Sequence, residues 1–137
     1  MANRTDLYVH LVWATTRRLP LITADVTPRL YAHMAQRCRH LSCVPLAIGG
    51  MPDHVHLLVD LHPTVTVALL MKDVKGASSL FMRTLLVPGS FFQWQTGYAA
   101  FSVSKRSLPR LQDYIANQEQ HHVQGSIIPG AEPPSAF

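Results

Sequence analysis

The stretch CVPLAIGGMPDHVHLLVDL, residues 43–61, decides the fold, because it reads as two apolar runs around one turn. Both runs are short and rich in residues that favour strands, and the Gly, Pro and Asp between them favour a turn. We therefore expect strands over residues 43–50 and 54–61 that pair as an antiparallel hairpin. The first of these strands is expected to stop at Gly49 and Gly50.

Helix and strand patterns alternate on both sides of this hairpin. In chain order they predict a strand over 6–16, a helix over 27–42, the hairpin, a helix over 64–86, a strand over 91–104 and a helix over 109–122. Thr27 and Pro28 suit the start of the first helix, as its cap and its first residue. This order predicts an α+β fold of the ferredoxin-like kind, an antiparallel four-stranded sheet with helices packed on one face.

Length and composition suit one domain. A chain of 137 residues without repeats or linkers predicts one domain over residues 1–122, followed by an irregular, Pro- and Gly-containing tail over 123–137. No apolar run is long enough to span a membrane, no signal-peptide pattern is present, and two cysteines are too few for a disulfide framework, so we expect a cytoplasmic protein. The net charge of +4 is compatible with a polyanionic partner but supports one only weakly.

Two histidines stand two residues apart inside the second hairpin strand. Since side chains of a strand alternate between its faces, His54 and His56 share one face, and Val55 and Leu57 share the other, which would be the core face. The two imidazoles are then roughly 6–7 Å apart at Cβ, a separation that one metal ion can bridge. The alternative is that they are ordinary polar residues on a solvated face. Asp53, just before them, is a candidate to orient His54.

The last predicted helix contains a tyrosine and a glutamine one turn apart, Tyr114 and Gln118. Taken alone, the tyrosine suits a core position and the glutamine a solvated one. Taken with the histidine pair, they fit one chemistry. Two imidazoles and an amide oxygen leave positions open on a divalent cation, which can withdraw charge from a phosphate, and a phenol nearby can attack that phosphate to form a phosphotyrosine.

These residues together resemble a known family. His54-Val55-His56 resembles the HUH motif, and Tyr114-x-x-x-Gln118 resembles the single-tyrosine branch of that superfamily, the IS200/IS605-type transposases. Further segments are similar in the same order, over about residues 7–122: YVHLVWATTRR, AIGGMPDHVHLLV, MKDVKGASSLFMR, FQWQTGYAAFSVS and YIANQEQHH.

The resemblance implies a prokaryotic enzyme that cuts and rejoins single-stranded DNA at insertion-sequence ends and recognises an end hairpin. It implies that His54, His56 and Gln118 hold Mg²⁺ or Mn²⁺. Tyr114 would attack the scissile phosphate, giving a 5′-phosphotyrosine and a free 3′-hydroxyl. It further implies a homodimer formed through the sheets, and leaves open whether Tyr114 serves its own subunit's metal or the partner's.

Basic residues supply candidate contacts to DNA. One face of the helix over 64–86 carries four polar or basic side chains at steps of three and four: Lys72, Lys75, Ser79 and Arg83. A solvated helix face is the alternative, and phosphate contacts are favoured by the family-like KGASS context. Arg17 and Arg18 after the first strand are similar candidates. Gly76 suggests that something approaches the backbone of the helix closely. His10, inside the first strand, is interpreted as a structural residue.

After His122 the chain reads VQGSIIPGAEPPSAF, which departs from the family's pattern. His121 and His122 fit that pattern but receive no role. The departure keeps a second interpretation open, a DNA-hairpin-binding protein that is domesticated or has lost catalysis.

Overall fold

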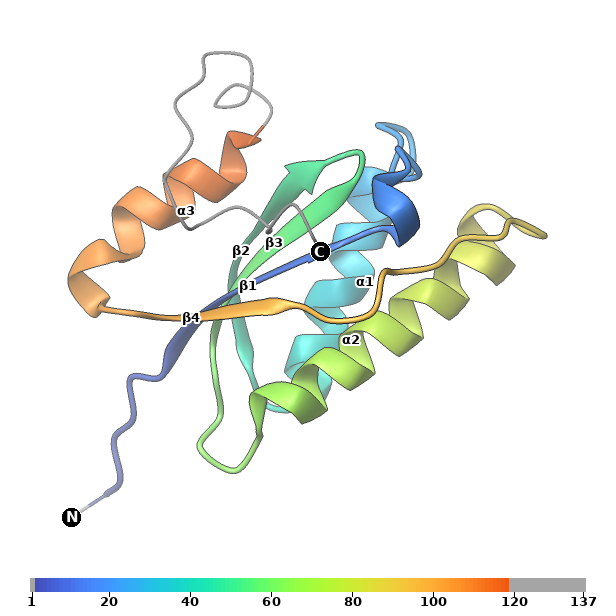
Figure 1. Cartoon of the computed structure of the whole chain (residues 1–137). Helices are drawn as coiled ribbons and strands as arrows, with labels where there is room; N and C mark the ends of the chain where they lie inside the picture. Colours follow the sequence, from blue (N-terminus) through green and yellow to red (C-terminus); the bar gives the residue numbers. More distant parts are fainter. Residues whose placement is uncertain (1, 119–137) are drawn as a thin grey trace.

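The computed structural model describes residues 2–118 and contains one four-stranded antiparallel sheet. Its strands are β1 (Tyr8–Ala14), β2 (Val44–Met51), β3 (His54–Asp60) and β4 (Ala99–Val103). They lie in the order β2-β3-β1-β4, so β3 and β1 are central and β2 and β4 are the edges (Figure 1). The hairpin of β2 and β3 and the predicted ferredoxin-like α+β fold are confirmed.

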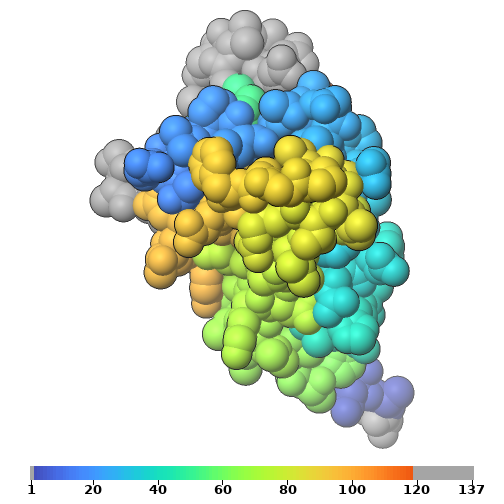
Figure 2. Space-filling view, turned by 90° about the vertical axis from the view of Figure 1, so that its right-hand side faces the viewer, coloured from blue at the N-terminus to red at the C-terminus, as the bar shows by residue number. Residues whose placement is uncertain are grey.

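Helices cover both faces of this sheet, not one. Helices α1 (Thr27–His40) and α2 (Val67–Phe81) pack on one face, and α3 (Leu108–Ala116) lies on the other (Figure 1). The π turn η2 (Met82–Leu86) prolongs α2, and short 3₁₀ turns, η1 (Thr16–Arg18) and η3 (Lys105–Ser107), follow β1 and β4. The predicted one-sided packing therefore holds for the first two helices and is wrong for the third. Figure 2 shows the side where α2 and the segment after it cover the molecule.

The alternation of side chains along β1 and β3 divides the interior into two clusters. Facing α1 and α2 is the larger, apolar cluster, whose strand residues are Leu11, Trp13, Val55, Leu57 and Val59. Facing α3 is a smaller cluster of Leu58, Tyr114 and Ile115. The bidentate ion pair of Arg37 and Asp73, with both N–O distances at 2.8 Å, ties α1 to α2 at the rim of the larger cluster.

Several element boundaries differ from the predicted ones. Strand β2 does not stop at its glycines but runs to Met51, and β4 is only the last part of the predicted 91–104 strand. Before β4, Trp94 forms a single bridge to Thr15, and Gly97 adopts a positive φ of 95°, which interrupts the extended chain. Thr27 begins α1, but its hydroxyl donates to the Thr23 carbonyl instead of capping the helix.

Candidate active site on the α3 face of the sheet

The two histidines of β3 lie side by side on the face that α3 covers. The ring centroids of His54 and His56 are 5.1 Å apart, and both residues are on the same side of the sheet as Leu58. They are 1% and 0% exposed, so the alternative of two solvated polar residues is wrong. Paired on one face and buried, these imidazoles have the arrangement that the metal hypothesis requires.

Helix α3 brings Tyr114 beside His56. The centroid of the Tyr114 ring is 6.0 Å from that of His56, with the rings nearly perpendicular at 84°. The helix ends at Ala116, earlier than predicted, and Gln118 follows just beyond it with its Nε2 donating to the Tyr114 carbonyl at 3.3 Å. Both residues are 2% exposed. Three of the four residues predicted to form the site, His54, His56 and Tyr114, therefore lie together, and Gln118 contacts the backbone of Tyr114, while His121, His122 and the tail lie outside the described residues.

Close backbone packing holds α3 against the hairpin. A Cβ atom added to Gly49 would stand 1.9 Å from the Ile115 carbonyl oxygen, so only glycine permits this approach of helix and strand. The side chain of Gln112 also donates to the Leu46 carbonyl of β2, at 3.3 Å. Gly49 thus positions Tyr114 without touching it. The sequence marked Gly49 as a turn signal, and nothing local to it indicates the helix that lies above.

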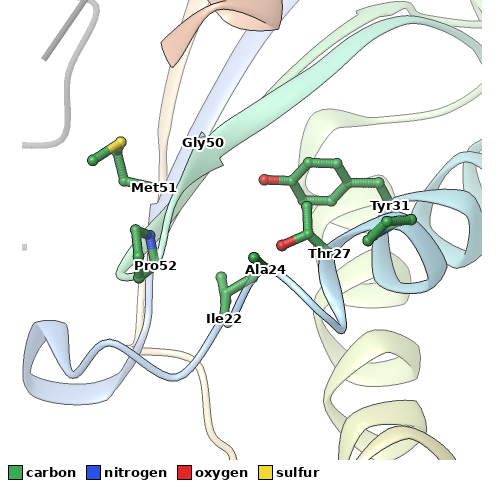
Figure 3. A pocket seen from close by; sticks show the side chains of 8 residues that line it. Ile22, Ala24, Thr27, Tyr31, Gly50, Met51 and Pro52 are labelled. Carbon is green, nitrogen blue, oxygen red and sulfur yellow. The ribbon is translucent and has the colours of Figure 1, made fainter. Parts of the chain in front are cut away.

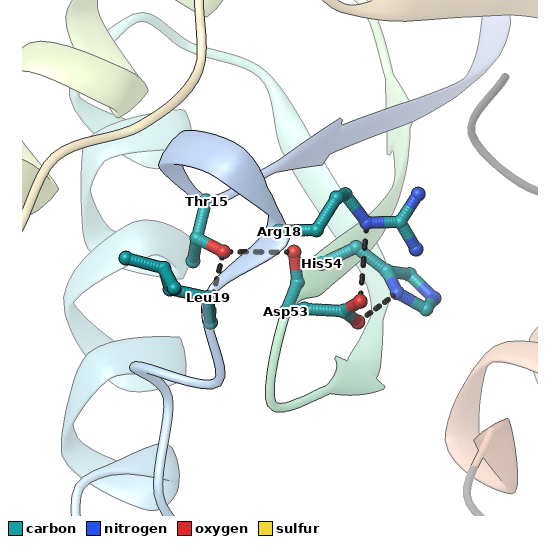
Figure 4. A network of polar contacts seen from close by, with 5 residues as sticks. All are labelled: Thr15, Arg18, Leu19, Asp53 and His54. Carbon is teal, nitrogen blue, oxygen red and sulfur yellow. Dashed lines mark hydrogen bonds and ion pairs between the residues drawn. The ribbon is translucent and has the colours of Figure 1, made fainter. Parts of the chain in front are cut away.

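A chain of polar contacts holds His54 from one side (Figure 4). Its Nδ1 lies 2.8 Å from Asp53 Oδ1, and Arg18 Nε donates to the other oxygen, Oδ2, at 3.1 Å. Burial raises the pKa of Asp53, but the hydrogen bond and charge of His54, together with Arg18, outweigh it and hold the pKa below its ordinary value. Asp53 is therefore a carboxylate that accepts from both neighbours, which supports the prediction that it orients His54.

The turn after β1 places Arg18 for this contact. Arg17 and Arg18 both have positive φ angles, 51° and 56°, which residues other than glycine rarely adopt. Thr15 stabilises the turn, since its hydroxyl donates to the Leu19 carbonyl at 2.6 Å and lies 3.2 Å from the Asp53 carbonyl. Arg17 is exposed, whereas Arg18 has its ion pair with Asp53 and is only partly exposed.

His56 is held by a residue that the sequence did not single out for function. His10 of β1 places its Nε2 2.8 Å from His56 Nδ1, and it is 2% exposed. The signal was available, because His10 lies on the same face as His54 and His56 once β1 and β3 are paired. Finding this contact from the sequence would have required the strand order, which the local pattern does not give.

The donor atoms fit a divalent cation. Because Nδ1 of each histidine contacts Asp53 or His10, Nε2 is the nitrogen of each ring that would coordinate. Within residues 2–118 no three His, Cys, Asp or Glu side chains are grouped to hold a metal. The two imidazoles alone therefore do not complete a ligand set, and a metal here would need a further ligand of another kind.

The basic face of α2 is used mostly within the protein. Lys75 Nζ donates to the carbonyls of Gln95 and Gly97, at 2.8 and 2.9 Å, and burial lowers its pKa. Arg83 donates to the hydroxyl of Ser79 and, at 3.3 Å, to the Phe92 carbonyl. These contacts tie α2 to residues 92–97, and Lys72 remains exposed.

Gly76 does not mark a close contact in the described residues. A Cβ atom added to it would meet nothing within 4 Å.

Two pockets flank the turn of the hairpin. One of about 460 Å³ adjoins His54 and is lined by Arg18, Pro20, Met51, Pro52, Asp53 and His54. The other, of about 380 Å³, lies between the hairpin and the start of α1 and is lined by Ile22, Ala24, Thr27, Pro28, Tyr31, Gly50, Met51 and Pro52 (Figure 3). Burial raises the pKa of Tyr31 to about 12, so its phenol is neutral. The first pocket opens beside the candidate site.

No described helix has both the length and the apolar character needed to cross a membrane.

Known proteins match this chain over nearly all the described residues. Residues 3–118 match the family described as "Transposase IS200 like". The transposase for insertion sequence element IS200 of Salmonella typhimurium is 30% identical over 140 residues, which cover 98% of this chain and 91% of the relative. The ISDra2 transposase TnpA of Deinococcus radiodurans is 27% identical over 120 residues, 82% of this chain and 84% of that protein.

Solved structures share the fold. A crystal structure of a presumed transposase from Deinococcus radiodurans R1 superposes with a TM-score of 0.70 at 27% identity, over 86% of this chain and 95% of that one. A REP-associated tyrosine transposase bound to a REP hairpin superposes with a TM-score of 0.67 over 89% of this chain and 74% of that one, and at 13% identity it shows the fold alone. The match over residues 3–118 and the identity to the IS200 transposase show that this chain belongs to the IS200-like transposase family.

Proposed function

We propose that this protein cuts and rejoins single-stranded DNA through a covalent bond to Tyr114, with His54, His56 and Gln118 as the ligands of Mg²⁺ or Mn²⁺. One observation carries the proposal. Two buried imidazoles on one face of β3 meet a tyrosine from α3, with the His56 and Tyr114 ring centroids 6.0 Å apart. A purely structural core gains little from burying two imidazoles beside a phenol, since each polar group must then be satisfied.

In the proposed reaction the Tyr114 hydroxyl oxygen attacks the scissile phosphorus. A phosphorus–oxygen bond to tyrosine forms and the bond to the 3′ oxygen breaks. The phenol gives up its proton, and the leaving 3′ oxygen takes up one proton to become a hydroxyl. A bound divalent cation would withdraw charge from the phosphate during both steps. The covalent bond conserves the free energy of the phosphodiester, so a 3′-hydroxyl can later displace Tyr114 and rejoin the strand without an external energy source.

For a DNA strand to reach Tyr114, part of the protein must move or the strand must enter through a pocket. At 2% exposure its hydroxyl is not open to a DNA strand in the described arrangement. We propose that the strand enters through the pocket of Arg18, Asp53 and His54. Arg17, exposed beside this pocket, and the exposed Lys72 are our leading candidates for phosphate contacts. Lys75, Ser79 and Arg83 remain candidates, but they already make contacts within the protein.

Recognition of a DNA hairpin and assembly as a homodimer are the wider parts of the proposal. A protein with the same fold, the REP-associated tyrosine transposase, was solved bound to a REP hairpin. For this chain the resemblance of its segments over residues 7–122 supports a hairpin at each end of the DNA substrate. Since residues after 122 depart from the family's pattern, the alternative is a protein that binds the hairpin but does not cleave.

A cleavage assay separates these two functions. The protein is incubated with Mn²⁺ and labelled single-stranded DNA from both sides of its gene, and covalent adducts are read on a denaturing gel. We expect an adduct from the wild type, none from Tyr114→Phe, and an undiminished yield from the matched control Tyr98→Phe, since Tyr98 is exposed and outside the site. Hairpin binding without an adduct, where the ISDra2 transposase cleaves its own substrate, would favour the binding protein.

A further inference from the structure

His10 and His56 form a buried imidazole pair inside the sheet. His10 Nε2 and His56 Nδ1 are 2.8 Å apart, and the rings stack with centroids 5.1 Å apart and planes 20° from parallel. The register pairs Val12 of β1 with His56, so His10 is the diagonal neighbour of His56 on the same face. Phe101 of β4 borders the other side of His10, with ring centroids 5.9 Å apart.

The hydrogen bond between two neutral imidazoles contains one proton, which has two places. It can sit on His56 Nδ1 and be donated to His10 Nε2, or sit on His10 Nε2 and be donated to His56 Nδ1. Only the first arrangement gives His56 a lone pair on Nε2, the nitrogen that would coordinate a metal. In the second arrangement Nε2 of His56 carries a proton, and coordination there is blocked.

We propose that His10 is a positioning residue for metal binding, which accepts the Nδ1 proton of His56 and so holds His56 in the tautomer that coordinates through Nε2. The inference rests on the proposed function, in which His56 is a metal ligand. Its step beyond that function is a role for a residue of β1 that lies outside the histidine motif, the tyrosine helix and the basic faces.

The two metal-ligand histidines are therefore held by chemically different acceptors. Asp53 is a carboxylate, and a carboxylate can only accept, so it gives His54 one tautomer whether or not a metal is bound. His10 is an imidazole and accepts through Nε2 only when its own proton is on Nδ1. Metal binding at His56 consequently fixes the tautomers of both rings, and stacking against His56 fixes the orientation of the acceptor.

Titration of the protein with Mn²⁺ alone, followed by calorimetry, tests the inference without DNA or catalysis. His10→Phe keeps a ring of similar size and removes the acceptor, and we expect about 10–100-fold weaker Mn²⁺ binding. His10→Gln retains an oxygen that can accept from Nδ1, and we expect it to recover part of the affinity. A residue that only fills space would show the opposite order, because Phe resembles the imidazole ring more closely than Gln does.

His56→Ala separates failure of this inference from failure of the proposed function. If the wild type does not bind Mn²⁺, or His56→Ala binds it equally well, the metal site is wrong and the role of His10 is wrong with it. If His56→Ala loses binding but His10→Phe binds like the wild type, only the positioning role is overturned.

Nitrogen-15 NMR of the wild-type protein without metal gives a readout that does not depend on a folded variant. We expect the proton of His56 on Nδ1, donated to His10. A proton on Nε2 of His56 in the metal-free protein would overturn the inference.

Discussion

The two faces of β3 are equally buried but chemically different. Val55, Leu57 and Val59 point to α1 and α2 and belong to the larger apolar cluster. His54, His56 and Leu58 point to α3, and the two histidines contact Asp53, His10 and the ring of Tyr114. A strand with one dry face and one polar face would ordinarily expose the polar one, and here a short helix covers it.

The difference between the two faces separates the residues that stabilise the fold from the residues of the candidate site. Apolar side chains gain free energy from burial itself, whereas a buried imidazole must recover its lost hydration through hydrogen bonds. The face toward α1 and α2 therefore contributes most to the stability of the fold, and in our proposal the face toward α3 carries the chemistry. Changes on the two faces should have separable effects on stability and on the position of α3.

The largest expected effect on stability comes from the apolar face. We expect Leu57→Ala to lower the free energy of unfolding by about 2–5 kcal/mol, because a fully buried side chain leaves a cavity. The measurement is unfolding by denaturant. The matched variant Leu58→Ala removes the same atoms on the other face, and we expect its clearest effect to be faster hydrogen exchange of α3. Equal exchange of α3 in both variants would contradict the separation of the faces.

The next largest effect concerns the contact of α3 with the hairpin. In Gly49→Ala the new Cβ would fall 1.9 Å from the Ile115 carbonyl, so the helix must shift, at a cost of about 1–3 kcal/mol. We expect both lower stability and a lower yield of the covalent adduct, since Tyr114 moves with α3. Thermal unfolding and the cleavage assay measure the two effects.

Gly76→Ala is the matched control for this prediction. Nothing stands within 4 Å of the added Cβ, and alanine favours a helix, so we expect a gain of about 0.5–1 kcal/mol. The adduct yield should stay at the wild-type value. A loss of adduct in this variant would show that something outside the described residues approaches α2 at Gly76.

The smallest effect is the pH dependence of the ion pair between α1 and α2. The hydrogen bonds from Arg37 lower the pKa of Asp73 below its ordinary 3.8, so the pair stabilises the folded protein fully above that value and loses its effect as pH falls through the lower folded pKa. Both side chains are partly exposed, at 30% and 20%, which limits the contribution to about 0.2–1 kcal/mol. Asp73→Asn should be less stable than the wild type at pH 6, and the difference should shrink as the pH falls below 3.8. A constant difference between pH 6 and pH 2 in denaturant unfolding would contradict this origin.

The sequence predicted those features that depend on local period and on turn residues. Alternation along residues 54–60 assigned the histidines to one face and the valines to the other, and the helical step from Tyr114 to Gln118 brought these two together. The order of elements was enough for the ferredoxin-like sheet.

Features that depend on the packing of distant segments were missed. No local pattern tells which face α3 covers, so the one-sided arrangement was wrong and Gly49 was read as a strand stop. His10 gained a partner only when β1 and β3 were paired, and the carbonyl partners of Lys75 and Arg83 were missed because they lie in a segment of irregular structure.

Diffraction from crystals grown with Mn²⁺, recorded at a wavelength where manganese scatters anomalously, tests most directly whether the polar face of β3 is a metal-dependent active site. We expect one anomalous peak within bonding distance of Nε2 of His54, Nε2 of His56 and Oε1 of Gln118. Crystals of the protein that show no peak beside His54 and His56, or show manganese bound only elsewhere, would contradict the central claim.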